Sequence, residues 1–529
     1  MTGLAELAAV LGVFMAVNGA AWGQAAPVAP PGPGLALDGA IAIALRQNAN
    51  IQLSQQLIEA GRGNEKIARG PFDTVATAGT NSARSYRQLR RDEALALETM
   101  RLTPHDQITE TTSYRLGLQQ TLQSGAVMGG ALVVDSVQDN AQRMQGIPPQ
   151  SSVNLEFTLR LPLLRSAGRD TVTAALQAAG FELDAAHSEF AHINAQVVLN
   201  VTLAYWDYLA RSRQLAIATE SEQRARQLLA EMQRLAAADQ IPRAELELIG
   251  ASAAEKTATR IAVEQLLAES RRALARLLGV SARDAVRLAL PTQDYPRSQD
   301  APVEEIAVPE PWIERSLLRR ADLAAELARE RAARARVTVA RNNLRPQLDF
   351  NVALGYGASA QSVAISNLDT LLGRRFSGPA VSVSLAYQFP VQNNAADGLF
   401  IAQSAALDAS LVRQRDLRNT IGASVENAVQ ALRRTARQLS AGREAVLRYS
   451  TALRNERRKR ELGTATLIDV LNIEDRYDNA LTAAVQREQA FANAIAQLRF
   501  EAGVLVARKG ESFNVRVDDL LSHRLNLDE

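Results

Sequence analysis

The sequence predicts a mainly α-helical chain with β-strands, in which long coiled-coil hairpins and barrel-type strands form two structural repeats. Three observations predict this fold: a long heptad seam, strands that alternate apolar and polar residues, and a pattern that recurs in both halves of the chain. With 529 residues, the chain is long enough for several domains or for one elongated body.

The heptad seam lies near the C-terminus. With Leu467 at position a and Val470 at position d, apolar residues recur as far as Leu505, interrupted only by Glu474 and Glu488. At about 1.5 Å per residue, such a helix is roughly 55–60 Å long, so it needs an equally long partner to cover its apolar stripe. The partner is expected just upstream, from residue 398, and a turn at residue 463 folds the two helices into a hairpin.

The N-terminus reads as an export signal. A short apolar run at 7–17 precedes Ala21-Trp22-Gly23, a small-x-small cleavage site, which predicts a signal peptide at 1–23. Glu6 stands where a basic residue is usual, and the alternative is an apolar tail. A Pro-rich linker follows at 24–36. Because the chain has no cysteine, we expect neither a disulfide framework nor an N-terminal lipid anchor.

The first repeat is expected at 37–280. It begins with a helix from 37 to 69, continues with strands within 72–162, and ends with a long helical hairpin at 170–278. The alternation is clear at 114–122 and 153–161, weaker at 72–80 and 127–137, and the charged stretch 87–107 reads as a solvated loop.

A proline-rich connector at 281–311 leads to the second repeat at 312–508. Its expected parts are a helix at 312–343, strands within 346–391 and a hairpin at 398–505, before a C-terminal tail at 509–529. The strands are about ten residues long with aromatics near their ends, which is typical of transmembrane β-barrels. A soluble β-sandwich shows similar alternation, but several such strands behind an export signal favour the barrel.

The two halves repeat each other. At one constant offset, Ile41, Leu45, Ala49 and Ile51 correspond to four residues of the second half. Those four are Ile313, Leu317, Ala321 and Leu323. Both strand sets also end on an apolar-Pro-apolar tripeptide, at 161–163 and 389–391, and both hairpins end on a glycine. The chain is therefore expected to contain two copies of one unit.

These features resemble the TolC-like outer-membrane efflux family. The resemblance covers the chain after the signal and rests on the joint order of three motifs. The motifs are Pro-Leu-Leu-Arg at 162–165, Ala-Tyr-Trp-Asp at 204–207 and the Gly-Thr-x-x-x-x-Asp-Val-Leu turn at 463–471. The resemblance implies a homotrimer whose strands close one barrel in the lipid of the Gram-negative outer membrane. It also implies a periplasmic α-barrel that meets a periplasmic adaptor protein and an inner-membrane transporter.

The chain departs from this family pattern in its strand number. Up to six strands are expected, whereas the family usually has four, so the extra hairpin near 114–137 either lies outside the membrane or enlarges the barrel. The first helical turn lacks the glycine of the second. Adaptor contacts are expected at the two hairpin turns, which comprise Gly463, Thr464, Asp239, Gln240, Ile241 and Pro242.

The resemblance also implies acidic side chains at the periplasmic entrance. Asp469 matches one of them, but the next position is Asn472, and Glu474 or Asp475 could compensate. The other interpretation of Asp469 is a helix-start residue that the helix dipole favours, and both roles are compatible.

Other functions find little support in the sequence. The net charge of +2 gives no bias toward nucleic acid, and the histidines at 105, 187, 192 and 523 show no metal spacing. No phosphate loop or nucleophile elbow is present, so we expect no enzyme, no cofactor and no metal. The expected function is the exit duct of a tripartite efflux pump for small molecules. The alternatives are the duct of a type I protein secretion system, or a periplasmic adaptor or structural coiled-coil protein.

Overall fold

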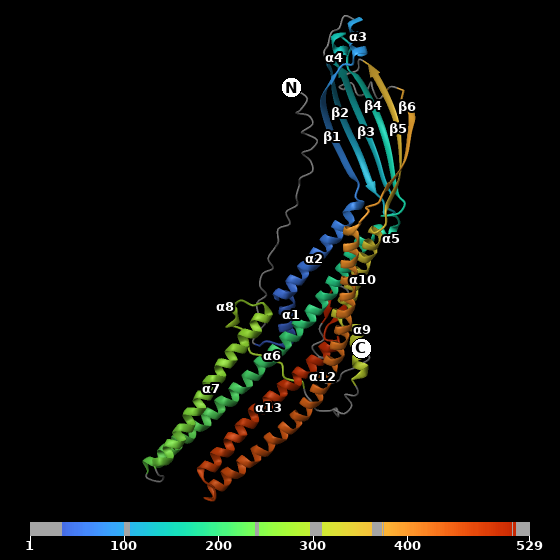
Figure 1. Ribbon diagram of the computed structural model, residues 1–529. Helices are drawn as coiled ribbons and strands as arrows, with labels where there is room; N and C mark the ends of the chain where they lie inside the picture. Colours follow the sequence, from blue (N-terminus) through green and yellow to red (C-terminus); the bar gives the residue numbers. More distant parts are fainter. Residues whose placement is uncertain are drawn as a thin grey trace.

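The computed structural model describes residues 34–99, 106–238, 243–296, 309–361, 373, 375–509 and 512–514. A β-sheet forms one end of an elongated body, and two long helical hairpins extend from the middle to the opposite end (Figure 1). The expected signal peptide and most of the linker and of the C-terminal tail lie outside the described residues. The mixture of long helices and an antiparallel sheet confirms the predicted fold class.

One antiparallel sheet contains six strands in sequence order. The strands are β1 Val75–Gln88, β2 Asp106–Thr121, β3 Val127–Asp139, β4 Gln150–Pro162, β5 Gln347–Gln361 and β6 Ser377–Gln388. The weakly alternating stretches near 72–80 and 127–137 therefore lie in or next to strands of the same sheet. The stretch 87–107 was expected to be a loop, but it contains the helix α3 Arg91–Thr99, whose Glu93 pairs with Arg87 at 3.0 Å.

Helices occupy most of the remaining described residues. The long ones are α2 Ala49–Arg69, α6 Ala174–Ala237, α7 Arg243–Leu278, α10 Ala321–Asn343, α12 Asn394–Glu461 and α13 Leu467–Glu501. Shorter ones are α1 Leu37–Gln47, η1 Gly70–Phe72, α4 Asn140–Met144, α5 Arg169–Val172, α8 Ala282–Ala285 and α9 Glu310–Arg319. A small hairpin of β7 Ala507–Lys509 and β8 Ser512–Asn514 follows. Among the described residues, no helix combines the length and apolar character needed to cross a membrane.

The helix at the start of each repeat is broken, which the sequence did not predict. Asn48 interrupts the first with an extended backbone (φ −64°, ψ 128°), and Arg320 interrupts the second in the same way (φ −68°, ψ 122°). Each break packs against the glycine that ends the following hairpin. A Cβ on Gly279 would lie 2.3 Å from the carbonyl oxygen of Gln47, and one on Gly503 would lie 3.2 Å from the backbone of Arg319. Contacts distant in sequence therefore set the break positions.

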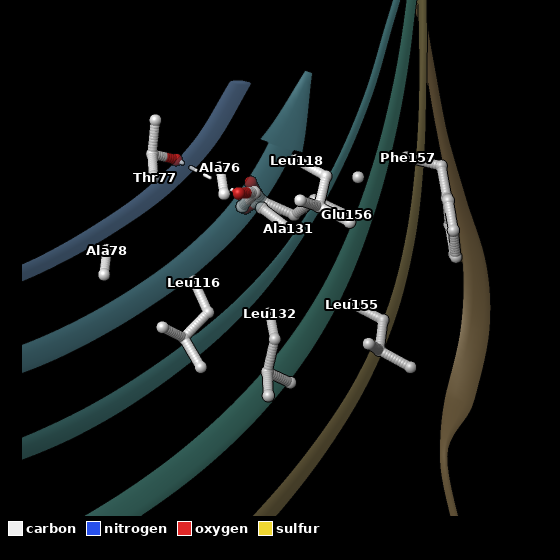
Figure 2. A pocket seen from close by; sticks show the side chains of 12 residues that line it. Ala76, Thr77, Ala78, Leu116, Leu118, Ala131, Leu132, Leu155, Glu156 and Phe157 are labelled. Carbon is white, nitrogen blue, oxygen red and sulfur yellow. Dashed lines mark hydrogen bonds between the residues drawn. The ribbon is translucent and has the colours of Figure 1, made fainter. Parts of the chain in front are cut away.

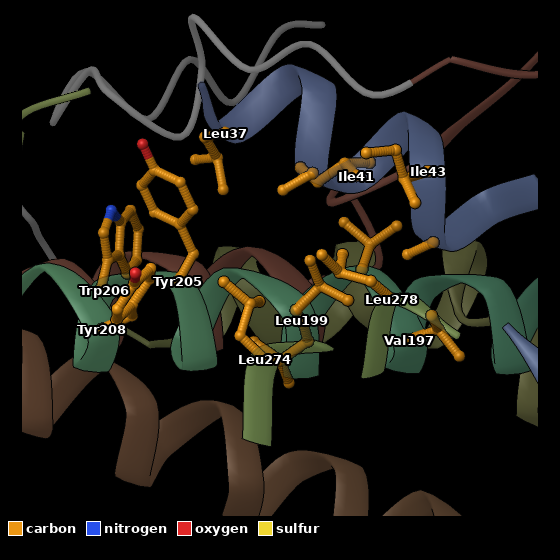
Figure 3. Packing of buried hydrophobic residues seen from close by; sticks show 14 of the residues in the cluster. Leu37, Ile41, Ile43, Val197, Leu199, Tyr205, Trp206, Tyr208, Leu274 and Leu278 are labelled. Atoms are coloured by element: carbon orange, nitrogen blue, oxygen red, sulfur yellow. The ribbon is translucent and has the colours of Figure 1, made fainter. Parts of the chain in front are cut away.

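The first core lies where α1, α6 and α7 meet (Figure 3). Leu37 and Ile41 of α1 pack toward Leu199 of α6 and Leu278 of α7. The Ala-Tyr-Trp-Asp motif belongs to this core: Tyr205 is fully buried, donates a hydrogen bond to the carbonyl of Leu35 at 2.8 Å and accepts one from the backbone of Gln293 at 3.0 Å. The motif thus ties the start of the described chain and the connector to α6.

The second core lies between α9, α10, α12 and α13. Trp312 of α9, Ile421 and Leu432 of α12, and Ile495 of α13 are all buried in it. Ile495 lies on the predicted heptad seam and is fully buried, whereas Leu481, on the same seam nearer the tip, is only half-buried. The seam is therefore covered most completely in the middle of the molecule.

Candidate functional site

The far ends of the two hairpins carry a cluster of charged residues that links one hairpin to the other. Arg224 of α6 reaches α13, where its guanidinium lies 2.5 Å from the carboxylate of Asp478 and 2.6 Å from that of Glu474. Glu474 and Asp478 are one helical turn apart, so both present their carboxylates to the same face of α6. We call these residues, together with Ser221, Lys256 and Asp475, the tip network.

The tip network also includes α7. Lys256 lies 2.6 Å from Asp475 and 3.4 Å from Asp478, and the hydroxyl of Ser221 donates a hydrogen bond to Asp478 at 2.5 Å. Asp478 is only 7% exposed. A carboxylate so little exposed needs charged partners, because its desolvation is otherwise costly. The network therefore stabilises the two hairpins against each other only while its cations stay in place.

Burial and charge act in opposite directions on the cations. Burial lowers the pKa of Lys256, but the hydrogen bond and charge of Asp475, with the charge of Asp478, outweigh it, so the pKa lies above its ordinary value. Burial likewise opposes the charged form of Arg224, yet its carboxylate partners raise its pKa. Both side chains are thus cationic at neutral pH.

Contacts between α6 and α13 change in character along the hairpins. In the middle of the molecule they are apolar, since Ala492, Ala496 and Phe500 of α13 belong to the first core. Toward the tips, Arg213 pairs with Glu488 at 3.1 Å, and the tip network follows. A hydrophobic contact holds the hairpins together at the centre, whereas the ends depend on ionic links.

The sequence-predicted entrance residues fall into three environments. Glu474 and Asp475 belong to the tip network, while Asn472 is exposed. Asp469 is also exposed and forms a capping box with Thr466, whose backbone N–H and hydroxyl donate hydrogen bonds to it at 3.0 Å and 2.6 Å. The hydrogen bond from the Thr466 hydroxyl is the main cause that lowers the pKa of Asp469, and the bond from the Thr466 backbone N–H adds to it. The structure thus places Asp469 at the helix start, as one of its two interpretations requires.

The predicted turn residues are described for the second hairpin only. Gly463 has a left-handed backbone (φ 74°), and Thr464 closes the end of α12 with a hydrogen bond from its N–H to the carbonyl of Lys459 at 2.9 Å. At the first hairpin, the four residues 239–242 lie outside the described residues.

Sequence reasoning missed Arg224, Lys256 and Asp478. Asp478 sits one helical turn after Glu474, and this spacing was the only local signal. Arg224 and Lys256 belong to the other hairpin, roughly half the chain away, so nothing in the local pattern joins them to Asp478. Among the described residues, no group of three or more potential metal-binding side chains comes together.

Comparisons with known proteins identify what this architecture is similar to. Residues 312–504 match a family described as outer membrane efflux protein. No curated protein is a match for the chain. A membrane protein from Pseudomonas aeruginosa has a similar structure, with a TM-score of 0.65 at 18% identity, covering 88% of this chain and 93% of that one.

Two further solved structures have the same fold. The CmeC outer membrane channel of Campylobacter jejuni gives a TM-score of 0.64 at 14% identity, with 88% of this chain and 85% of that chain covered. The outer membrane protein VceC of Vibrio cholerae gives 0.61 at 17% identity, with 88% and 96% covered. At these identities the likeness establishes the fold, and the family match concerns the second repeat.

Proposed function

We propose that this chain is a member of the TolC-like outer-membrane efflux family. Its function is then that of the exit duct of a tripartite efflux pump. The duct passes small molecules from the periplasm across the outer membrane of a Gram-negative bacterium. It is a channel and not an enzyme, so the energy for transport comes from elsewhere in the pump.

The observation that carries this proposal is the joining of an amphipathic sheet to two long hairpins with ionically linked tips. The sheet has one apolar and one polar face, as a lipid-embedded wall requires. A single copy leaves β1 and β6 unpaired at the sheet edges, and open edges are not tolerated in lipid. Closure by several copies removes the edges, which supports the proposed homotrimer.

The partners follow from the same geometry. The hairpin tips lie at the end opposite the sheet, so they extend into the periplasm when the sheet is in the outer membrane (Figure 1). We propose that a periplasmic adaptor protein contacts the turns at Gly463–Thr464 and at 239–242. The second partner in the pump is an inner-membrane transporter. Asp469, Asn472, Glu474 and Asp475 then lie near the entrance, where the tip network links the two hairpins.

A periplasmic adaptor is the alternative of a different class, and the fold argues against it. This chain joins two long helical hairpins to a six-stranded sheet, and the similar outer membrane channels CmeC and OprN each cover 88% of it. The experiment that tests the proposed function is ion conduction. Protein purified from the outer membrane and reconstituted in planar bilayers should carry a current, whereas intact insertion without any current would refute a duct.

A further inference from the structure

The unexpected feature of the sheet is that its strands outnumber the helices that join it. Four long helices lead into or out of the sheet: α2 precedes β1, α6 follows β4, α10 precedes β5, and α12 follows β6. These helices pack side by side in the order α2, α6, α10, α12. The strands attached to them follow the same order, but β2 and β3 are inserted between β1 and β4.

The side chains of β2 and β3 continue the apolar face of their neighbours without a gap. One row of directly paired residues consists of Ala78, Leu116, Leu132, Leu155 and Tyr356, one from each of the first five strands. Figure 2 shows Leu116, Leu132 and Leu155 projecting from the same side of the sheet. Leu116 is 58% exposed in the single chain, as a lipid-facing side chain must be.

The opposite face is mostly polar or small across the same strands, with three valines of β3 among its residues (Val127, Val133 and Val137). A neighbouring row pairs Gln119, Gly129, Thr158, Ala353 and Ser382, from β2 to β6. On this face of the inserted strands, Ser113 donates a hydrogen bond to Asp135 at 2.6 Å, and Arg115 pairs with Glu156 at 3.3 Å. In the middle of β2 and β3, the apolar row and the polar groups therefore lie on the same two faces as in the rest of the wall, as in a water-filled barrel.

We infer that the β2–β3 hairpin is part of the lipid-embedded wall, and that the trimer closes an eighteen-stranded barrel as wide as the helical duct below it. This inference rests on the proposed function. Neighbouring strands are antiparallel throughout the six-stranded sheet, so β6 of one copy can pair antiparallel with β1 of the next. Barrels of about 16–18 strands enclose an aqueous channel.

The widths of the two layers agree with this closure. Strands about 4.8 Å apart and tilted by about 40° occupy about 6.3 Å of circumference each, so six occupy roughly 38 Å. Four helices packed about 9 Å apart occupy about 36 Å. Four strands would occupy only about 25 Å and would narrow the duct at the outer membrane. With six strands, the barrel is not the narrowest part, and cargo size is limited at the hairpin tips.

Adjacent cysteine substitutions in β3 test the position of the hairpin. The chain has no cysteine, so only the introduced thiol reacts. In the reconstituted full-length protein, a membrane-impermeant maleimide should label Ala131→Cys on the polar face about tenfold or more faster than Leu132→Cys on the apolar face. Both should react equally after denaturation. Equal labelling in the membrane would place the hairpin outside the lipid and overturn the inference.

A deletion tests the width. The last residue of β1 and the first residue of β4 lie at the same end of the sheet. A short loop that replaces residues 89–149 therefore joins the two strands and leaves four antiparallel strands. Ser382→Cys, on the polar face of β6, is introduced into both forms and probed from outside with maleimide-polyethylene glycols of increasing mass. The full-length protein should admit larger polymers, since its barrel is about one and a half times as wide. Equal size limits in two trimeric forms would contradict the inference.

The two tests separate this inference from the proposed function. If the protein is trimeric and conducts ions but Leu132→Cys reacts like Ala131→Cys, only the wide barrel is refuted. If the protein neither forms trimers nor conducts ions, the proposed function is refuted, and the inference that rests on it is refuted as well. If the deletion form does not assemble, the cysteine pair decides alone.

Discussion

Arg224 and Asp478 join the two hairpins across 2.5 Å, although they belong to different repeats of the chain. Each has further partners: Arg224 also binds Glu474, and Asp478 also binds Ser221 and lies near Lys256. This network is the closest ionic link between α6 and α13 near the tips among the described residues. Several predictions about opening depend on it.

Removal of Arg224 should loosen the tips. Arg224→Ala leaves two carboxylates without their shared cation, so we expect a loss of about 1–3 kcal/mol in stability. The ion current per inserted trimer should rise, and planar-bilayer recordings measure it. Arg448→Ala is the matched control, because Arg448 is exposed and its ion pair among the described residues lies within α12, with Glu444 at 2.8 Å. Equal currents in the two variants would exclude a closing role for the tip network.

Alkaline pH should have a similar effect through Lys256. Because its folded-state pKa is raised, its contribution is complete below the unfolded value of about 10.4 and is lost as the pH rises through the folded value. The current should therefore increase above pH ~10.5. Lys256→Arg should remove this increase, since a guanidinium stays protonated there. An increase of the same size in both proteins would assign the transition to another group.

The charge of Asp469 should affect ion selectivity if it lies at the entrance. Three copies around one axis attract cations, so Asp469→Asn should reduce cation preference and Asn472→Asp should increase it. Reversal potentials under a salt gradient measure both. Thr466→Ala is the control, because it removes a capping partner without changing charge. Unchanged reversal potentials in both charge variants would leave Asp469 with its capping role only.

The heptad seam can be tested where it is most buried. Ile495→Asp places a carboxylate in the second core and should cost several kcal/mol, so that little trimer is recovered from membranes. Leu481→Asp should be milder, since Leu481 is half-buried. Leu447→Asp, on the exposed side of α12 at 65% exposure, should give the parental yield. A parental yield for Ile495→Asp would mean that this seam does not hold the hairpin.

The close approach of Gly279 to Gln47 also makes a prediction. Gly279→Ala introduces a Cβ that the left-handed backbone (φ 76°) and the Gln47 carbonyl both oppose, so it should destabilise by about 2 kcal/mol or more. Gly180→Ala should be neutral or stabilise by up to about 1 kcal/mol, because Gly180 lies in α6 with open space around it. Thermal unfolding of the two proteins compares them. A loss as large for Gly180 as for Gly279 would argue against this contact.

Local patterns were sufficient to predict the fold class. The heptad spacing of Val470, Ile495 and Leu498 indicates a long packed helix, and the alternation in Val153–Leu161 indicates a two-faced strand. Both signals are periodic and depend only on which side of an element is buried. The same periodicity failed at Asn48 and Arg320, because the helix breaks there are set by packing against Gly279 and Gly503.

The tip network could not be predicted in the same way. Arg224 lies in a helix with many charged residues, and its local pattern is that of an ordinary solvated face. Only the antiparallel packing of α6 on α13 brings it to Glu474 and Asp478. By contrast, the helix-start interpretation of Asp469 depends only on Thr466, three positions before it. This spacing can be read from the sequence alone.

The central claim is that several copies of this chain close one duct in the outer membrane. Native mass spectrometry of the complex extracted from purified outer membranes tests it most directly. The account predicts a complex of three identical chains, in which the β6 and β1 edges of neighbouring copies pair. A stable single chain would contradict it, because one six-stranded sheet keeps an open edge in lipid. A complex of two or of four chains would contradict the trimer.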